Sequence, residues 1–79
     1  NVCEDDMNAE FEREVGQKIR HFRENRGMTQ EQLAAKLQVE GCDVTRSAIA
    51  KIEVGQRHLY IDEFRLICRI LKVRYEDLL

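Results

Sequence analysis

The segment 45–53 combines hydrogen-bonding side chains with a spacing typical of a short helix. Ile49 and Ile52 share one face of that helix, which leaves a small, polar and positive face on the other side. That face is formed by Arg46, Ser47, Ala50 and Lys51. Guanidinium and ammonium groups donate to guanine O6 and N7, and a serine hydroxyl can donate or accept, so the chemistry on offer is recognition of base edges.

Two helix start signals must position this face. Thr29 and Gln32 form a capping box, which predicts that a helix begins directly after Thr29. Thr45 can cap the next helix in the same way, with Val44 and Ile49 at its two staple positions. Two short amphipathic helices packed at an angle are a common way of placing side chains in a DNA groove.

Apolar residues recur at helical spacing in the rest of the chain. We expect helices over about 10–25 and 61–71 and a closing turn over about 75–79, with Gly27 and Gly55 ending the first and third helices. The inward stripes are Phe11, Val15, Ile19 and Phe22; Leu33, Ala34 and Leu37, extended by Val39; and Phe64, Ile67, Cys68 and Leu71. The pattern predicts an all-α fold, a compact five-helix bundle.

The composition is that of one small globular domain. It includes 43% hydrophobic residues, 35% charged residues and no proline, which suits helices. The net charge of −2 hides an asymmetry, because residues 1–14 carry six acids and one base whereas the remainder carries twelve bases and nine acids. We expect residues 1–9 to be a poorly ordered acidic leader and residues 10–79 to form a basic domain that can bind nucleic acid.

Several classes of protein are excluded by what the sequence lacks. No apolar run approaches a membrane span and no secretion leader is recognisable, so we expect a cytoplasmic protein with no membrane partner. The three cysteines lack C-x-x-C spacing, and we therefore expect reduced thiols, no metal and no cofactor. No catalytic motif is present, and so short a chain has little room for a cleft, so we do not expect an enzyme.

Four motifs follow one another in a recognisable order between residues 15 and 79. They are Gly16-x-x-Ile19-Arg20-x-Phe22-Arg23, Gly27-Met28-Thr29-Gln30-x-x-Leu33-Ala34, Thr45-Arg46-Ser47-Ala48-Ile49-x-x-Ile52-Glu53-x-Gly55, and Phe64-x-x-Ile67-x-x-x-Leu71 with a closing Leu78. This order resembles the helix-turn-helix domain of the phage repressor and Cro family, also called Xre-like regulators, and implies a lambda-repressor-like bundle. In that family the third helix reads bases in the major groove.

The resemblance assigns roles to three parts of the chain. It implies base contacts by the outward face of the third helix, where Ala50 would be close enough to touch a thymine methyl. The residues with this role are Arg46, Ser47, Ala50 and Lys51. It implies phosphate contacts at the start of the second helix and in the loop after the third, made by Gln30, Gln56, Arg57 and His58. Arg23 and Glu53 are implied to form a structural salt bridge between the first and third helices.

The function that the resemblance implies is sequence-specific DNA-binding transcriptional regulation, of the kind performed by bacterial and prophage repressors. The partner would be a double-stranded DNA operator, bound by a homodimer at paired half-sites. The alternative is a protein-interaction or antitoxin-like module, in which the same fold meets a protein partner. A salt series separates the two, because phosphate contacts make affinity fall as the salt concentration rises.

The turn between the second and third helices departs from the family pattern. Residues 37–44 form a longer connection than this family usually needs. The simplest accommodation is an extra turn of the second helix followed by a bend at Gly41, with the staple residues still seating the third helix. Glu40 and Asp43 should then lie away from phosphate.

Overall fold

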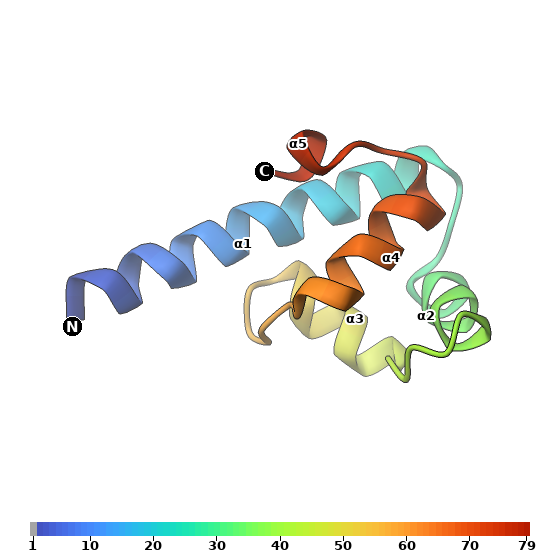
Figure 1. Cartoon of the computed structure of the whole chain (residues 1–79), viewed down its shortest axis with the longest axis horizontal. Coiled ribbons are helices and arrows are strands. Elements are labelled where there is room, and N and C mark those ends of the chain that lie inside the picture. The colour runs from blue at the N-terminus through green and yellow to red at the C-terminus, as the bar shows by residue number, and fades with distance from the viewer. Residues whose placement is uncertain (1) are drawn as a thin grey trace.

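Five helices make up the structure, a computed structural model that describes the backbone of residues 2–79 and the side chains of residues 9–79. They are α1 (Val2–Asn25), α2 (Gln30–Val39), α3 (Arg46–Glu53), α4 (Ile61–Leu71) and α5 (Tyr75–Leu78). The described backbone has no strand, so the predicted all-α five-helix bundle is confirmed. Figure 1 shows that α3, α4 and α5 lie along the second half of α1, while its first half extends away from them.

The first helix begins much earlier than its apolar stripe predicts. The stripe indicates a start near Glu10, but α1 begins at Val2. No glycine or proline interrupts residues 2–15, and acidic residues near a helix N-terminus stabilise it by opposing the partial positive charge of that end. The prediction of a poorly ordered leader over 1–9 falls mostly on side chains outside the described part of the chain.

The core is built from contacts of α3 with α1 and α2, and of α4 with α1, α2 and α5. Its fully buried large side chains are Ile19, Leu33, Leu37, Val44, Ile49, Ile67, Leu71 and Leu78. Each such side chain contributes about 1.5–3 kcal/mol to folding by leaving water. The apolar stripes predicted for α2 and α4 are confirmed, and Cys68, at 2% exposure, is a small core residue as expected.

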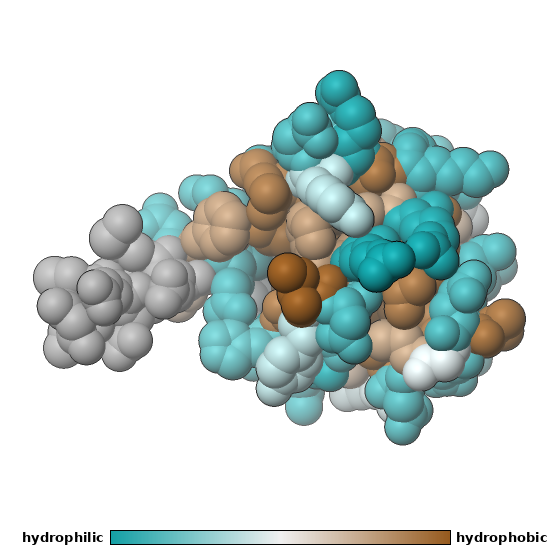
Figure 2. Space-filling view, in the orientation of Figure 1, coloured by the Kyte–Doolittle hydropathy of each residue, from teal (hydrophilic) through white to brown (hydrophobic). Residues whose placement is uncertain are grey.

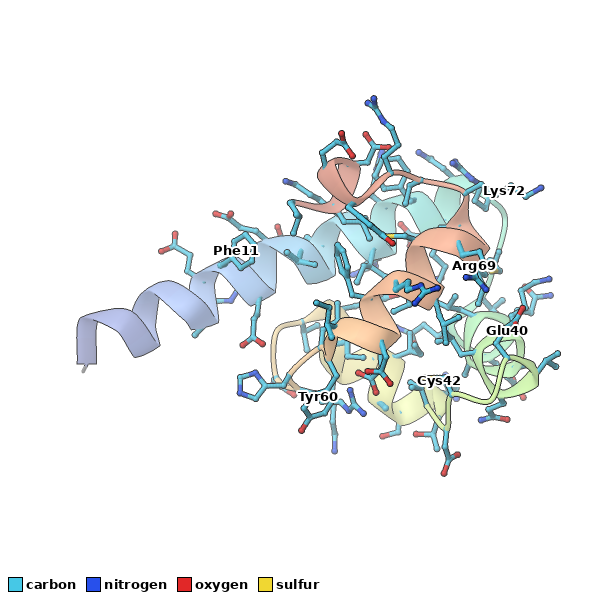
Figure 3. The ribbon with its side chains drawn as sticks, in the orientation of Figure 1. Phe11, Glu40, Cys42, Tyr60, Arg69 and Lys72 are labelled. Carbon is cyan, nitrogen blue, oxygen red and sulfur yellow. The ribbon has the colours of Figure 1, made fainter. Side chains whose placement is uncertain are left out.

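Two residues of the predicted stripes lie outside the core. Phe11 is 48% exposed, because it belongs to the part of α1 that extends past the other helices (Figure 3). Val39 is 86% exposed at the last residue of α2, so it does not extend the buried stripe of that helix. Helical periodicity identifies a face of a helix but not how far along it a neighbour reaches, which explains Phe11. Val39 is exposed for another reason: at about 100° per residue it lies about 200° around α2 from Leu37, on the side opposite the buried stripe.

The predicted caps set the beginnings of α2 and α3. The Thr29 hydroxyl accepts from the Gln32 backbone N–H at 3.0 Å, and the Gln32 side chain accepts from the Thr29 N–H at 2.8 Å, which completes the capping box. The Thr45 hydroxyl accepts from the Ala48 N–H at 3.1 Å. Gly55, with a φ of 78°, ends α3 in the left-handed conformation that its position predicts.

The enlarged turn is accommodated mainly by a longer α2, as expected. The helix runs through Val39, and Gly41 then adopts a φ of 86°, while the Cys42 N–H donates back to the Leu37 carbonyl at 2.9 Å. The Gln38 side chain donates to the Val44 carbonyl at 3.1 Å and ties the end of the turn to α2. Val44 is 1% exposed, so the residue that seats α3 remains in the core.

Candidate nucleic-acid interface

The outward face of α3 is the surface best suited to a nucleic acid. Ile49 and Ile52 are buried beneath it, at 0% and 2% exposure. The side chains of Arg46, Ser47 and Lys51 are exposed, and Ala50 is half-buried between them. Among the side chains of residues 9–79, neither Arg46 nor Lys51 belongs to an ion pair, so both charges face solvent.

A close contact with α1 sets the position of α3. Gly16 lies directly against the end of α3, where a Cβ added to it would stand 2.2 Å from the Ile52 carbonyl oxygen and 2.9 Å from that of Glu53. Only a residue without a side chain permits this approach. The close approach of α1 to α3 therefore explains why a glycine occupies position 16, a reason that the sequence alone did not reveal.

The salt bridge implied between Arg23 and Glu53 is present, and it is buried. Arg23 Nε donates to Glu53 Oε2 at 2.7 Å and Nη2 donates to Oε1 at 3.0 Å, with side-chain exposures of 8% and 2%. The hydrogen bond from Arg23 to Glu53 raises the pKa of the guanidinium above its ordinary value. Arg23 Nη1 also donates to the Met28 carbonyl at 2.8 Å, so the pair joins α1 both to α3 and to the turn before α2.

Gln30 belongs to the same network. Its side-chain amide donates to Glu53 Oε1 at 3.0 Å, which links the start of α2 to the end of α3. Beside it lies a shallow hollow that is lined by Arg20, Arg23, Met28, Thr29, Gln30, Glu31 and Arg46. The first backbone N–H groups of a helix lack partners inside the helix and favour an anion, so a phosphate at this end of α2 would meet both these donors and nearby guanidinium groups.

The loop after α3 holds its arginine in a specific geometry. Arg57 donates from Nη1 to Glu63 Oε1 at 2.8 Å and from Nη2 to Glu63 Oε2 at 3.0 Å, and Nη1 also donates to the His58 carbonyl at 2.9 Å. Its guanidinium carbon lies 5.8 Å from the centre of the Tyr60 ring. Glu63 was not expected as a partner of Arg57 from the sequence. The available signal was its position in the first turn of α4, where it also accepts from the Tyr60 N–H at 3.0 Å.

The pKa of Glu63 is lowered by these bonds. Burial on its own raises the pKa, but the hydrogen bonds from Arg57 and from the Tyr60 N–H outweigh burial and bring it below the ordinary 4.5. Ionised Glu63 therefore stabilises the fold above that value, and the contribution is lost as the pH falls through the lowered pKa.

We expect Glu63→Gln to reduce the acid sensitivity of folding. In urea unfolding, the variant should be less stable than the unmodified chain at pH 7, and the gap should shrink as the pH falls through the lowered pKa of Glu63, where the carboxylate itself becomes protonated. Glu40→Gln, at an exposed position in the turn, is the control and should keep the pH profile of the unmodified chain. A gap that stays constant from pH 7 to pH 3 would contradict the role assigned to the carboxylate.

His58 and Gln56 are presented differently within the same loop. His58 Nδ1 lies within hydrogen-bonding distance of Glu12 Oε2, so the ring is directed to α1 in this structure. Gln56 is exposed, and its backbone N–H donates to the Lys51 carbonyl at 2.8 Å as part of the turn that ends α3. Of the four residues expected at phosphates, Gln56 thus has the most freely presented side chain.

Within the described part of the chain, no group of three or more His, Cys, Asp or Glu side chains is arranged to hold a metal ion. No helix there is both long and apolar enough to cross a membrane.

Burial raises the pKa of the Cys42 thiol, and the nearby carboxylates of Glu63 and Asp62 add to the effect. The turn that carries Cys42 therefore lies close to the beginning of α4.

Comparison with known proteins agrees with this geometry. A helix-turn-helix family profile matches residues 19–78. Control protein C.BamHI of Bacillus amyloliquefaciens is 38% identical over 65 residues, which cover 81% of this chain and 74% of that protein. No solved structure gives a significant match. The chain belongs to the helix-turn-helix family of DNA-binding transcription regulators.

Proposed function

We propose that the protein represses transcription by occupying a double-stranded DNA operator, with α3 in the major groove. The observation that carries the proposal is the exposed, cationic face of a helix whose opposite face is fully buried. Ile49, Ile52 and Glu53 hold α3 against the bundle. Arg46 and Lys51 therefore remain as the charged groups of α3 that are free to enter a groove. Regulation follows from occupancy of the site and requires no catalysis.

Direct reading of bases is assigned to the outward face of α3. Arg46 and Lys51 supply donors for guanine O6 and N7, and Ser47 can donate or accept at either kind of base pair. Ala50 is small enough to let the helix approach and to contact a thymine methyl. The half-site should therefore contain a guanine.

Phosphate contacts are assigned to both sides of α3. On one side Gln30 stands at the start of α2, and on the other the loop after α3 presents Gln56, Arg57 and His58. Arg57 has five N–H donors, so bonds to Glu63 and His58 leave donors for a phosphate. Because Glu63 balances its charge, Arg57 should add less to the salt dependence of binding than an arginine without a carboxylate partner would at the same phosphate.

The proposal includes a homodimer in the cytoplasm. Helix-turn-helix dimers bind half-sites whose centres lie about 34 Å apart, one turn of the DNA helix. Two copies of this chain would each place one α3 in successive major grooves on the same side of the duplex. Selection of bound sites from random DNA would reveal the half-site, its symmetry and its spacing together.

The test of base reading is Lys51→Ala measured on the selected operator and on random DNA. We expect a loss of about 1–3 kcal/mol on the operator, with relaxed preference at one base pair and a smaller loss on random DNA. Lys36→Ala removes the same charge from an exposed position in the last turn of α2 and is the matched control, which should lose little on either DNA. Equal losses on operator and random DNA for Lys51→Ala would contradict its assignment to bases.

A salt series tests whether DNA is bound at all. Retention should fall with rising salt, with a log–log slope of about 0.9 per neutralised phosphate. If no salt-dependent retention of DNA appears at low ionic strength, the operator proposal fails, and a protein-interaction module of the same fold would take its place.

A further inference from the structure

The loop after α3 is held against α1 at two points. A Cβ added to Gly55 would stand 3.0 Å from the Cα and the Cβ of Arg13, so the loop backbone lies directly on α1. Three residues further along the chain, His58 Nδ1 lies within hydrogen-bonding distance of Glu12 Oε2. Two neighbouring residues of α1 therefore fix both the backbone of this loop and the direction of its histidine ring.

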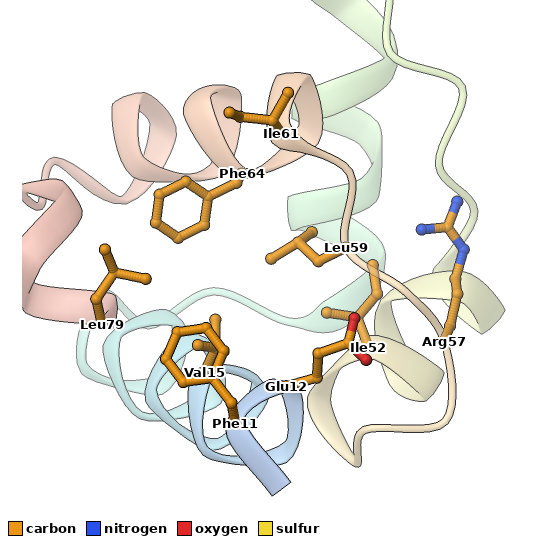
Figure 4. A pocket seen from close by; sticks show the side chains of 9 residues that line it. All are labelled: Phe11, Glu12, Val15, Ile52, Arg57, Leu59, Ile61, Phe64 and Leu79. Atoms are coloured by element: carbon orange, nitrogen blue, oxygen red, sulfur yellow. The ribbon is translucent and has the colours of Figure 1, made fainter. Parts of the chain in front are cut away.

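Glu12 lies at the edge of an apolar hollow of about 430 Å³. The apolar lining includes Phe11, Val15, Ile52, Leu59, Phe64 and Leu79. Figure 4 shows the Glu12 side chain directed away from Phe11 and toward Ile52, and Figure 2 shows hydrophobic side chains gathered where α4 begins and α1 extends away. The Glu12 side chain is only 26% exposed. A carboxylate that is largely withdrawn from water is stabilised by a charge-assisted hydrogen bond, which His58 can supply.

The contact with Glu12 decides which nitrogen of His58 can reach DNA. An ionised carboxylate only accepts hydrogen bonds, so Nδ1 must carry the proton that is donated to Glu12. The hydrogen bonds that His58 makes with residues 9–79 use its carbonyl oxygen and Nδ1, which leaves Nε2 without a partner there. The His58 side chain is 71% exposed, so Nε2 is the nitrogen available to a ligand.

The charge of the ring determines whether Nε2 can bind a phosphate. In a neutral imidazole with its proton on Nδ1, Nε2 is an acceptor and cannot bond to a phosphate oxygen, which is also an acceptor. In the imidazolium both nitrogens donate, so Nδ1 can bond to Glu12 while Nε2 bonds to phosphate. Histidine changes its charge in the range from pH 5 to pH 8. We propose that Glu12 makes His58 a phosphate ligand only as the imidazolium, so that each chain takes up a proton when it binds the operator.

The other charged groups around His58 do not replace Glu12. On α1, Arg13 lies beside the loop backbone, and within the loop Arg57 donates to the His58 carbonyl at 2.9 Å. The guanidinium of Arg57 is paired with Glu63 at the start of α4, so these two charges balance each other. Glu12 is thus the carboxylate in contact with the ring. The proton uptake rests on the proposed function, in which the loop after α3 contacts phosphates.

Operator affinity measured from pH 8 to pH 6 at constant ionic strength tests the proton uptake. We expect the affinity of the unmodified chain to rise by about tenfold as the pH falls, because the charge-assisted bond to phosphate forms only with the imidazolium. His58→Gln should bind with little change over this range. His21 is the other histidine of the chain and is exposed on α1, so His21→Gln is the matched control and should keep the rise. Equal pH dependence in the unmodified chain and His58→Gln would overturn the proposal.

Glu12→Gln tests whether the carboxylate selects the position of the proton. A glutamine amide can donate to Nδ1 as well as accept from it, so a neutral His58 can then carry its proton on Nε2 and donate to phosphate. Affinity at pH 8 should therefore approach the value at pH 6, and most of the pH dependence should disappear. Glu14→Gln removes the same charge from an exposed position of α1 and should keep the pH dependence. The same change in both variants at every pH would refute a specific role for Glu12.

Nitrogen-15 NMR of the imidazole in the free chain provides a readout that needs no DNA. At pH 8 the chemical shifts should place the proton of His58 on Nδ1 in the unmodified chain and move it toward Nε2 in Glu12→Gln. A proton on Nε2 in the unmodified chain would overturn the inference whatever the DNA measurements give. If DNA is retained but His58→Gln keeps the full pH dependence, the proton uptake is refuted and the operator proposal stands. If no DNA is retained at any pH at low ionic strength, the operator proposal fails and the proton uptake fails with it.

Discussion

Gly16→Ala is expected to destabilise the protein more than any other removal or addition of a single methyl group. A Cβ at this position would stand 2.2 Å from the Ile52 carbonyl oxygen and 3.0 Å from the Glu53 carbonyl carbon, both of which are backbone atoms. The contact cannot be relieved by turning a side chain, so α1 and α3 must separate. Overpacking typically costs about 1–3 kcal/mol, which is a large fraction of the stability of a small domain, and a clash with backbone atoms should lie at the upper end of that range.

Urea unfolding followed by circular dichroism measures this loss. Gln17→Ala is the control, because it adds the same helix-favouring residue at the next, exposed position of α1. Alanine favours helix over glycine by about 1 kcal/mol, so a purely local effect would make Gly16→Ala more stable. Stability equal to or above that of the unmodified chain would show that the close contact between α1 and α3 is absent.

Separation of these two helices should also impair DNA binding. The residues at the contact are the last two of α3, and a shift there changes the direction in which the whole helix points. Operator affinity of Gly16→Ala should therefore fall even at temperatures where the variant remains folded.

Glu53→Gln is the second large expected loss, at about 3 kcal/mol or more. The substitution keeps the shape of the side chain but leaves the Arg23 guanidinium, 8% exposed, without its counter-charge, and loss of one partner of a buried pair typically costs about 3–5 kcal/mol. Gln30 also loses a charged acceptor. Thermal and urea unfolding measure the change.

The exposed pair of Arg20 and Glu24 supplies the comparison. Its side chains are 60% and 55% exposed and its N···O distance is 3.3 Å, so Glu24→Gln should change stability by less than about 0.5 kcal/mol. Similar losses for Glu53→Gln and Glu24→Gln would contradict the burial of the first pair.

A double substitution distinguishes a buried charge from a merely tight contact. Arg23→Met combined with Glu53→Leu removes both charges. The double variant should lose much less stability than the sum of the losses in the two single variants, because each single substitution leaves the other charge buried without a partner. Additive losses would mean that the two residues act independently. The double variant also shows whether the orientation of α3 for DNA needs the ion pair or only filled space.

The helix boundaries at α2 and α3 could be predicted because their signals are local. The capping box of Thr29 and Gln32 and the cap at Thr45 join groups three residues apart, and their bonds form as the sequence predicts. The buried faces of α2 and α4 follow from the same kind of local information, since apolar residues one helical turn apart must share a side.

The sequence did not predict where α1 begins, nor how far along a helix its neighbours pack. Periodicity placed Phe11 on the inward stripe of α1, yet it is largely exposed because the other helices do not extend over it. The start of α1 near Glu10 was likewise inferred from the end of the apolar stripe, although a polar segment with good helix formers can continue a helix alone.

Some features of the candidate site could be predicted from the sequence, and others could not. The outward face of α3 follows from helical spacing alone, and the pairing of Arg23 with Glu53 from the family resemblance. The contact between His58 and Glu12 follows from neither, because the two residues are 46 positions apart and no pattern in one sequence records such a contact. The geometry of the loop after α3 is therefore a tertiary property.

Sequence alone was sufficient for five helices, the caps of α2 and α3 and the cationic face of α3, because these depend on interactions within one or two helical turns. Tertiary packing alone decided that Gly16 touches α3, that His58 meets Glu12, and that an apolar hollow forms where residues from both ends of the chain meet. The physical reason is that each of these contacts joins segments whose separation in space is set by the whole core, and not by their own residues.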